Sequence, residues 1–247
     1  MPDCIISMKN LTRKFDDFIA VNSISMDIKK GELFGLIGPN GAGKTTLLKM
    51  LSGQLEATSG SARVLGFDPS KESLNVKRYI GIVPEIEMPP SFLTGVEYLQ
   101  YVGLIRNLDD IDERVMHWIE FLDMKDVQNV PGKDLSKGTR QKLMIAAAFI
   151  HEPKLVFLDE PFIGLDPLYQ KKIKEHMIKY LDDGGTIFMC THILEIAEKM
   201  CTIISIINRG GIVSTGTPKE LIAKDKTLDS AFLRLIQTED KPSESEK

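Results

Sequence analysis

The chain has 247 residues, of which 43% are apolar and 27% are charged, so it can bury the core of one large domain or of two small ones. Its 31 basic and 35 acidic side chains give a net charge of −4. No dense run of Lys or Arg is present to neutralise a nucleic-acid backbone, which argues against DNA or RNA as a partner.

The three cysteines, Cys4, Cys190 and Cys201, are odd in number and have no CxxC spacing. They therefore argue against a disulfide framework and a thiolate metal site, and they favour the reducing cytoplasm. The longest apolar runs are far shorter than the roughly 20 residues that cross a bilayer. Any work at a membrane is therefore expected to use the helices of another chain.

The first part of the chain predicts strands and one helix. Residues 5–28 alternate between apolar and polar side chains, which indicates antiparallel strands. Residues 33–38 are continuously apolar, as in a strand covered on both faces. A glycine-rich loop follows, and residues 44–53 have helical spacing that ends in Gly53. This order predicts a strand, a loop and a helix.

The rest of the chain predicts alternating strands and helices. A second buried strand at 79–85 ends at Pro84, and a mostly helical subdomain is expected at about 89–152. Alternating β and α elements imply a parallel sheet flanked by helices. The predicted helices are 138–150, 168–181, 194–200, 217–225 and 228–236, and the predicted strands are 154–159, 186–191 and a pair within 202–216. One domain is expected at 1–237, and the polar segment 238–247 is predicted to be disordered.

The loop "GPNGAGKTT" at 38–46 has the spacing G-x-x-x-x-G-K-[ST], between a buried strand and a helix. Its glycines let backbone N–H groups face phosphate oxygens, and the helix N-terminus adds partial positive charge. Lys44 is predicted to reach the β- and γ-phosphates, and the Thr45 hydroxyl to bind Mg²⁺. The predicted nucleotide contacts of this loop are Gly38, Pro39, Asn40, Gly41, Ala42, Gly43, Lys44, Thr45 and Thr46.

A pair of acids follows the predicted strand in "LVFLDE". Adjacent carboxylates at the end of a buried strand need a cation, or a role as a proton acceptor, to account for them. Asp159 is predicted to hold Mg²⁺ through water, and Glu160 to act as the general base for an attacking water. The alternative is a pair of solvated loop acids.

The phosphate loop, "LSKGTRQ", "LVFLDEP", "GLDP" and "THILEIAE" follow one another in an order that resembles the ATP-binding cassette (ABC) ATPases, over nearly the whole chain. The resemblance implies an α/β P-loop NTPase fold with a mostly parallel core sheet, an N-terminal antiparallel β subdomain and an inserted helical subdomain. It also implies ATP and Mg²⁺ as cofactors. The expected partners are a transmembrane permease subunit and a second ABC ATPase subunit.

By this resemblance the segment "LSKGTRQ" at 135–141, which corresponds to the family's signature segment, would contact the γ-phosphate of ATP bound to the other subunit of a head-to-tail dimer. Ser136 and Gly138, at the start of a helix, would supply a hydroxyl, an N–H group and the helix dipole. Ser136 can also be an ordinary helix N-cap. The sequence departs from the family at Lys137, usually Gly, and at Thr139, usually Gln.

Four further residues acquire roles from the resemblance. His192 matches the switch histidine that binds the γ-phosphate and orients water, and Asp166 lies in the loop along the dimer interface. Phe15 occupies the place of an aromatic that stacks on adenine, or it is a small core aromatic. Glu85 replaces the usual Gln and is expected to bind Mg²⁺, unless it is a solvated loop acid. The following apolar stretch, to residue 99, either packs against the permease or covers a satellite core.

The expected function is ATP hydrolysis that powers transport through a separate permease from the cytoplasmic face of the membrane. The ending "LDSAFLRLI" resembles exporter cassettes and favours export. The dimer is expected to pair identical or different cassettes. Two alternatives stay open: a soluble ABC ATPase outside transport, and a nucleotide-gated regulatory module with little turnover, which the departures at Lys137, Thr139 and Glu85 motivate.

Overall fold

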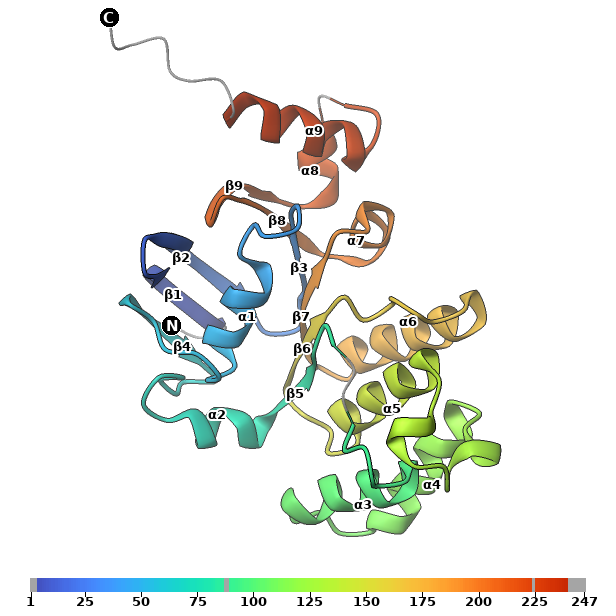
Figure 1. Ribbon diagram of the computed structural model, residues 1–247. Helices are drawn as coiled ribbons and strands as arrows, with labels where there is room; N and C mark the ends of the chain where they lie inside the picture. Colours follow the sequence, from blue (N-terminus) through green and yellow to red (C-terminus); the bar gives the residue numbers. More distant parts are fainter. Residues whose placement is uncertain (1–3, 87–88, 224, 240–247) are drawn as a thin grey trace, which may run out of the picture.

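The computed structural model describes residues 4–86, 89–223 and 225–239. Two sheets organise these residues (Figure 1). A three-stranded antiparallel sheet has the order β2-β1-β4, and a six-stranded sheet has the order β5-β6-β7-β3-β8-β9, in which only the β8–β9 pair is antiparallel. The strands are β1 Cys4–Phe15, β2 Phe18–Lys29, β3 Leu33–Ile37, β4 Ser59–Val64, β5 Ile80–Val83, β6 Leu155–Asp159, β7 Thr186–Thr191, β8 Ile203–Asn208 and β9 Gly211–Gly216.

The central strands β3, β6 and β7 are buried along their whole length, as their continuous apolar runs predict. Successive side chains of these strands enter two different cores because strand side chains alternate between faces. Val156 and Leu158 pack on one face of the sheet, and Leu155 and Phe157 pack on the other. The parallel sheet is therefore the middle layer between two hydrophobic cores.

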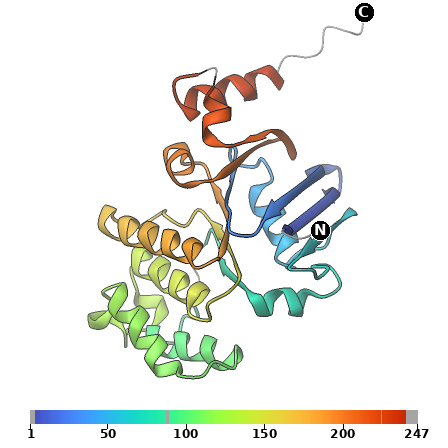
Figure 2. The ribbon, with the colours of Figure 1, turned by 180° about the vertical axis from the view of Figure 1, so that it is seen from behind.

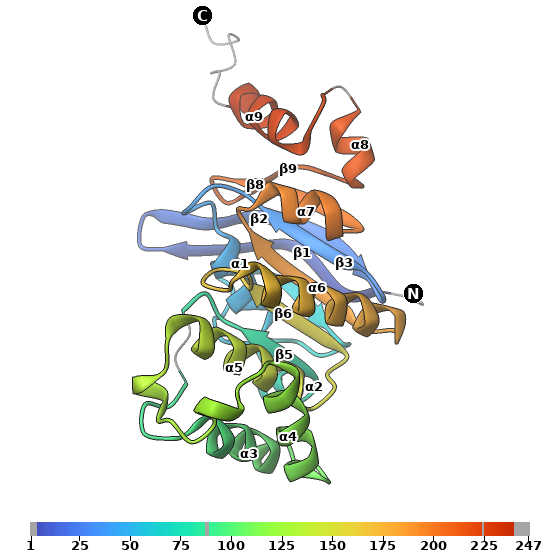
Figure 3. The same ribbon diagram turned by 90° about the vertical axis from the view of Figure 1, so that its right-hand side faces the viewer.

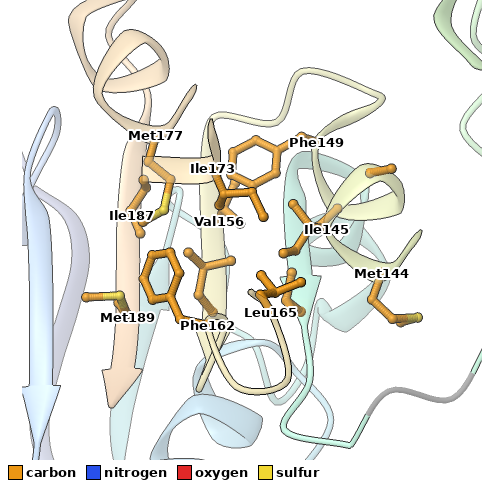
Figure 4. Packing of buried hydrophobic residues seen from close by; sticks show 14 of the residues in the cluster. Met144, Ile145, Phe149, Val156, Phe162, Leu165, Ile173, Met177, Ile187 and Met189 are labelled. Carbon is orange, nitrogen blue, oxygen red and sulfur yellow. The ribbon is translucent and has the colours of Figure 1, made fainter. Parts of the chain in front are cut away.

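Helices cover one face of this sheet, and a helix with the antiparallel sheet covers the other (Figures 1 and 2). On the first face, Phe149 of α5 and Ile173 and Met177 of α6 lie over Val156 and Ile187 of the strands (Figure 4). The helices are α1 Lys44–Leu51, α2 Ser73–Tyr79, α3 Gly95–Ile105, α4 Ile111–Phe121, α5 Lys137–Phe149, α6 Pro167–Asp182, α7 Leu194–Met200, α8 Pro218–Ile222 and α9 Leu228–Glu239, with 3-10 turns at Lys125–Val127 and Gly132–Asp134.

The chain between β5 and β6 forms α3, α4 and α5, which lie together at one end of the molecule (Figure 3). Helix α3 begins in a capping box, in which Thr94 accepts a hydrogen bond from the Glu97 N–H and Glu97 accepts one from the Thr94 N–H. Trp118 of α4 is only 5% exposed, which places it in the helical core. The limits of about 89–152 for a subdomain stay a prediction.

Trp118 belongs to an aromatic cluster formed with Phe121, Phe149, His176 and Tyr180. The His176 ring lies 4.9 Å, centroid to centroid, from the rings of both Trp118 and Phe149, in edge-to-face arrangements. The Tyr180 hydroxyl donates to the Pro153 carbonyl at 2.8 Å, just before β6 begins. The cluster therefore joins α4, α5 and α6 near the amino end of a sheet strand.

Most expected elements are present within a residue or two of their predicted bounds. Two elements were missed, namely strand β4, which completes the antiparallel sheet, and helix α2. Helix α9 continues to Glu239, so it includes the first two residues of the segment 238–247 for which disorder is predicted. Residues 240–247 lie outside the described residues, and disorder there stays a prediction. Within the described ranges, no helix has the length and apolar character needed to span a bilayer.

Candidate functional site

Three neighbouring parallel strands, β6, β7 and β3, end at the same edge of the sheet. The phosphate loop follows β3, Asp159 and Glu160 stand at the end of β6, and Thr191 and His192 stand at the end of β7. Carboxyl edges of parallel strands are the usual ligand sites of such folds. Strand pairing therefore brings together residues that are up to about 150 positions apart in the sequence.

The phosphate loop, residues 38–43, has an exposed tip at residues 39–41 and a buried base at Ala42 and Gly43. Gly43 has φ 107°, and a Cβ atom added there would lie 2.2 Å from the Ala20 carbonyl oxygen of β2. Only glycine fits this position. Gly43 is also the N-cap of α1, where no side chain accepts a hydrogen bond from the first helical N–H groups. These donors are suited to an anion.

Lys44 is 7% exposed, and its ammonium group lies against the loop itself. The Nζ atom donates to the carbonyl oxygens of Gly38 at 2.8 Å and Pro39 at 3.1 Å. A buried ammonium needs such partners because an unpaired charge away from water is unfavourable. A phosphate group beside the loop could replace them with charged acceptors.

Asp159 is 1% exposed, and its two carboxylate oxygens differ. Oδ2 accepts a hydrogen bond from the Thr45 hydroxyl at 2.6 Å, whereas Oδ1 is buried and has no partner within the described part of the chain. Burial raises the pKa of this carboxyl to about 6; the Thr45 hydrogen bond opposes the shift, and the charges of Glu85 and Glu160 add to it. A buried carboxylate with one unsatisfied oxygen is suited to a cation.

The donors at this place fit Mg²⁺, which prefers oxygen ligands and keeps several waters. Thr45 supplies a hydroxyl, Asp159 supplies the unsatisfied oxygen, and exposed Glu85 lies near enough for its charge to raise the Asp159 pKa. In the described ranges, no group of three or more His, Cys, Asp or Glu side chains could hold a metal alone. A bound Mg²⁺ would therefore need phosphate oxygens and water as further ligands.

Glu160 is held by three consecutive residues of the neighbouring strand end. Its backbone N–H donates to the Cys190 carbonyl at 2.9 Å. Its Oε1 accepts from the His192 backbone N–H at 2.9 Å and lies 2.7 Å from His192 Nδ1, while Oε2 accepts from the Thr191 hydroxyl at 3.0 Å. Glu160 also has φ 50°, a left-handed conformation that is uncommon for residues with a side chain.

The signature segment begins helix α5, away from the phosphate loop in sequence and in the fold (Figure 1). Ser136 is the N-cap of this helix, as the sequence allows: its Oγ accepts from the Thr139 N–H at 3.1 Å. A Cβ atom at Gly138 would lie 2.8 Å from the Gly164 carbonyl oxygen, so α5 requires glycine for its contact with the "GLDP" loop. In that loop, Asp166 caps α6 by accepting from the Leu168 N–H at 3.0 Å.

A family model described as "ABC transporter" matches residues 21–163, which is more than half of the chain. The chain belongs to this family. The resemblance drawn from the phosphate loop, the signature and the "LVFLDE" strand is thereby confirmed.

Curated relatives of this ABC protein are named for Nod factor export, linearmycin resistance and multidrug transport. It is 35% identical to the Nod factor export ATP-binding protein I of Cupriavidus metallidurans, over 88% of this chain and 73% of the relative. It is 33% identical to the linearmycin resistance ATP-binding protein LnrL of Bacillus subtilis, over 89% and 71%. The probable multidrug ABC transporter ATP-binding protein YbhF of Escherichia coli is 34% identical over 99% of this chain, but the match spans only 44% of that relative's length.

Solved structures agree with the ABC ATPase fold that the sequence predicts. An ATP-binding subunit of an ABC transporter superposes with a TM-score of 0.88 at 28% identity, over 94% of this chain and 99% of that one. The ATP-binding cassette MJ0796, described as a dimeric post-hydrolysis state bound to ADP and Pi, has a TM-score of 0.80 over 86% and 98% of the two chains. At 22% identity this second likeness concerns the fold alone.

The structure places the residues at which this ABC cassette departs from the family pattern. A Cβ atom at Gly164 would lie 3.4 Å from Cγ of Lys137, so the aliphatic part of Lys137 runs along the "GLDP" loop. Thr139 is shorter than the glutamine that the family usually has, and its hydroxyl lies 2.8 Å from Ser136 Oγ.

Phe15, at the position of the family's aromatic, is 40% exposed at the end of β1. The Arg13 guanidinium lies 4.5 Å from its ring centroid, so Phe15 is not a core aromatic.

Two residues of the site were not found from the sequence. Thr191 hydrogen-bonds to Glu160, and Gln141 of α5 donates from Nε2 to the Pro161 carbonyl at 2.9 Å, next to Glu160. Both are almost fully buried. In the sequence, Thr191 stands beside His192 and Gln141 ends the signature segment, which could have suggested a role in the site. Their hydrogen-bond partners, however, depend on which strands and helices are neighbours in the fold.

Proposed function

We propose that this chain binds ATP with Mg²⁺ and hydrolyses it to ADP and phosphate as the nucleotide-binding subunit of an ABC exporter. The observation that carries the proposal is the shared edge of β3, β6 and β7, where the Thr45 hydroxyl bonds to Asp159 and Glu160 bonds to His192. Family membership supports it. The names of the relatives, which concern multidrug transport, Nod factor export and linearmycin resistance, favour export.

The loop residues and Lys44 bind the phosphates in this proposal. Lys44 exchanges the Gly38 and Pro39 carbonyls for the β- and γ-phosphate oxygens, which are stronger acceptors because they are charged. Thr45, Asp159 and Glu85 hold Mg²⁺, whose positive charge neutralises phosphate oxygens. The exposed ring of Phe15 stacks on the adenine.

Glu160 accepts a proton from the water that attacks the γ-phosphorus, and the P–O bond to the β-phosphate oxygen breaks as the new bond forms. The His192 side chain is 49% exposed, so it can leave Glu160 and donate to the γ-phosphate. Since catalysis of this kind depends on positioning and charge stabilisation, the fixed strand ends are the appropriate support.

A second cassette completes each site in this proposal. Ser136 and Gly138 offer a hydroxyl and a helix N-terminus to the γ-phosphate bound by the other subunit, and Asp166 lies in the contact between the subunits. The proposed membrane partner is a separate permease on whose cytoplasmic side the cassette sits. Phe92 and Ile86, which are 77% and 66% exposed, are available on the surface for that contact.

The test compares phosphate release by the wild type, Glu160→Gln and Glu175→Gln, the last replacing an exposed glutamate on α6. Turnover in the wild type and Glu175→Gln, with none in Glu160→Gln, is expected. Light scattering of Glu160→Gln should then show a monomer without nucleotide and a dimer with ATP and Mg²⁺. A wild type as inactive as Glu160→Gln would contradict hydrolysis and leave a nucleotide-gated regulatory module.

A further inference from the structure

Glu160 depends on contacts of two kinds, and only one kind involves a side chain that solvent can reach. His192 contributes a ring that is 49% exposed. Thr191, the last residue of strand β7, contributes a hydroxyl and is only 1% exposed. If the ring leaves to bind phosphate, the carboxylate loses its contact with Nδ1 but keeps the hydrogen bonds from the Thr191 hydroxyl and the His192 N–H.

The direction of the Thr191 hydrogen bond is fixed by its surroundings. The Ile193 N–H donates to Thr191 Oγ1 at 3.1 Å, which occupies a lone pair of the hydroxyl. Its single hydrogen is then free to point toward Glu160 Oε2, 3.0 Å away, and an ionised carboxylate can only accept. Donation to a charged acceptor is among the stronger hydrogen bonds in proteins.

Strand pairing also fixes where Thr191 stands relative to the phosphates. Thr191 is the parallel register partner of Ile37, the last residue of β3, and the phosphate loop begins one residue later. The Glu160 backbone is tied to the same strand end through the Cys190 carbonyl. The Thr191 hydroxyl therefore fixes the position of the Glu160 carboxylate relative to the phosphate loop.

We propose that Thr191 is a positioning residue, whose hydroxyl holds the Glu160 carboxylate toward the attacking water after the His192 ring has moved to the γ-phosphate. This inference rests on the proposed ATP hydrolysis. Thr191 does not touch the nucleotide in this role, so its loss reduces the rate of the chemical step and leaves nucleotide affinity in place.

The experiment compares Thr191→Val, which removes the hydroxyl at nearly constant volume, with Thr191→Ser, which keeps it. The matched control is Thr186→Val at the other end of β7: Thr186 is also fully buried, and its Oγ1 accepts from the Gly31 N–H at 2.9 Å. Each valine variant therefore leaves one backbone N–H without its acceptor. Thermal unfolding compares their stability, phosphate release gives kcat, and calorimetry with ATP and no divalent ion gives the dissociation constant.

We expect kcat of Thr191→Val to fall about ten- to a hundredfold, the range for losing a hydrogen bond to a charged group, with the ATP dissociation constant changed less than about twofold. Thr191→Ser should recover most of the rate, and Thr186→Val should retain it. If Thr191→Val does not fold, Thr191→Ala, which avoids any steric conflict, repeats the comparison.

Three results would overturn the role of Thr191: wild-type kcat in Thr191→Val, an equal loss of kcat in Thr186→Val, or no recovery in Thr191→Ser. Each of them leaves the proposed function intact as long as the wild type turns over ATP and Glu160→Gln does not. A wild type without turnover would instead overturn the proposed function and, with it, this role.

Discussion

At the carboxyl edge of the parallel sheet, Lys44, Asp159 and Glu160 are buried and bonded to the phosphate loop, to α1 and to the end of β7, whereas in the aromatic cluster the partly buried His176 and Tyr180 lie among rings. The first set contains an unsatisfied carboxylate oxygen and contacts that a ligand could replace. The second set also contains an atom without a partner in the described residues, His176 Nε2, but aromatic rings lie around it, and the Tyr180 hydroxyl donates to the Pro153 carbonyl. Burial of polar groups therefore signals a ligand site only where the partners are exchangeable, and the two regions should respond differently to substitution.

The largest effect is expected from Asp159→Asn at the carboxyl edge. Loss of the carboxylate should lower kcat about a thousandfold, because charge stabilisation at the transferring phosphate is among the largest contributions to such reactions. The free energy of unfolding without nucleotide should not decrease, since a buried charge with an unsatisfied oxygen is removed. Phosphate release measures the expected loss of kcat, and urea unfolding measures the free energy of unfolding. A strongly destabilised Asp159→Asn would show that this carboxylate supports the fold.

Trp118→Leu should show the opposite behaviour. Trp118 is 5% exposed within the aromatic cluster, and its truncation leaves a cavity that should lower the free energy of unfolding by about 2 kcal/mol. ATP affinity at a temperature well below unfolding should be unchanged, as measured by calorimetry. A selective loss of ATP affinity in a stable Trp118→Leu protein would contradict the separation of the two regions.

Acid should destabilise the protein through the cluster. Burial, together with the charges of His117 and Lys179, lowers the pKa of His176 to about 4. The unfolded chain therefore binds a proton between pH 6.5 and 4 that the folded chain does not, so stability falls as the pH decreases through that window. His176→Phe should reduce this loss by about 2 kcal/mol at pH 5, as measured by urea unfolding at several pH values. His151, whose pKa burial also lowers to about 4, should leave some dependence of the free energy of unfolding on pH in the His176→Phe protein.

The smallest effect is expected from Phe15→Ala. Because this ring is 40% exposed, its loss should hardly change the free energy of unfolding. If it stacks on adenine, the ATP dissociation constant should rise about fivefold, in keeping with about 1 kcal/mol for an aromatic contact. Phe18→Ala, which removes a 61% exposed ring from the same hairpin, is the control. Equal effects of the two substitutions would argue against a specific place for adenine.

The sequence predicted those elements that carry a local signal. Strands β3, β6 and β7 are continuous apolar runs, so they were found with their order along the chain. Strand β4 was missed because "SGSARV" buries only Ala62 and Val64, and α2 was missed because Val76 is its one buried residue. Such short and mostly exposed elements are stabilised by tertiary contacts rather than by their own pattern.

The same distinction applies to the site. Lys44, Thr45 and Asp159 lie in motifs whose chemistry can be read from spacing, and the structure brings them to one edge. Thr191 and Gln141 lie within motifs that the sequence shows, but the motifs do not reveal their partners, which are set by the pairing of β6 with β7 and by the approach of α5 to residue 161. Long-range contacts of this kind become visible only in three dimensions.

The left-handed backbone at Glu160 has a consequence for how this chain can evolve. A glycine adopts φ 50° without the strain that a side chain brings, but Glu160→Gly would also leave the Thr191 hydroxyl and the His192 N–H without their acceptor. The hydrogen bonds of the carboxylate therefore offset the strain of the backbone that carries it. A laboratory selection for heat resistance alone should not favour glycine at position 160, so retention of glutamate there would not by itself report selection for turnover.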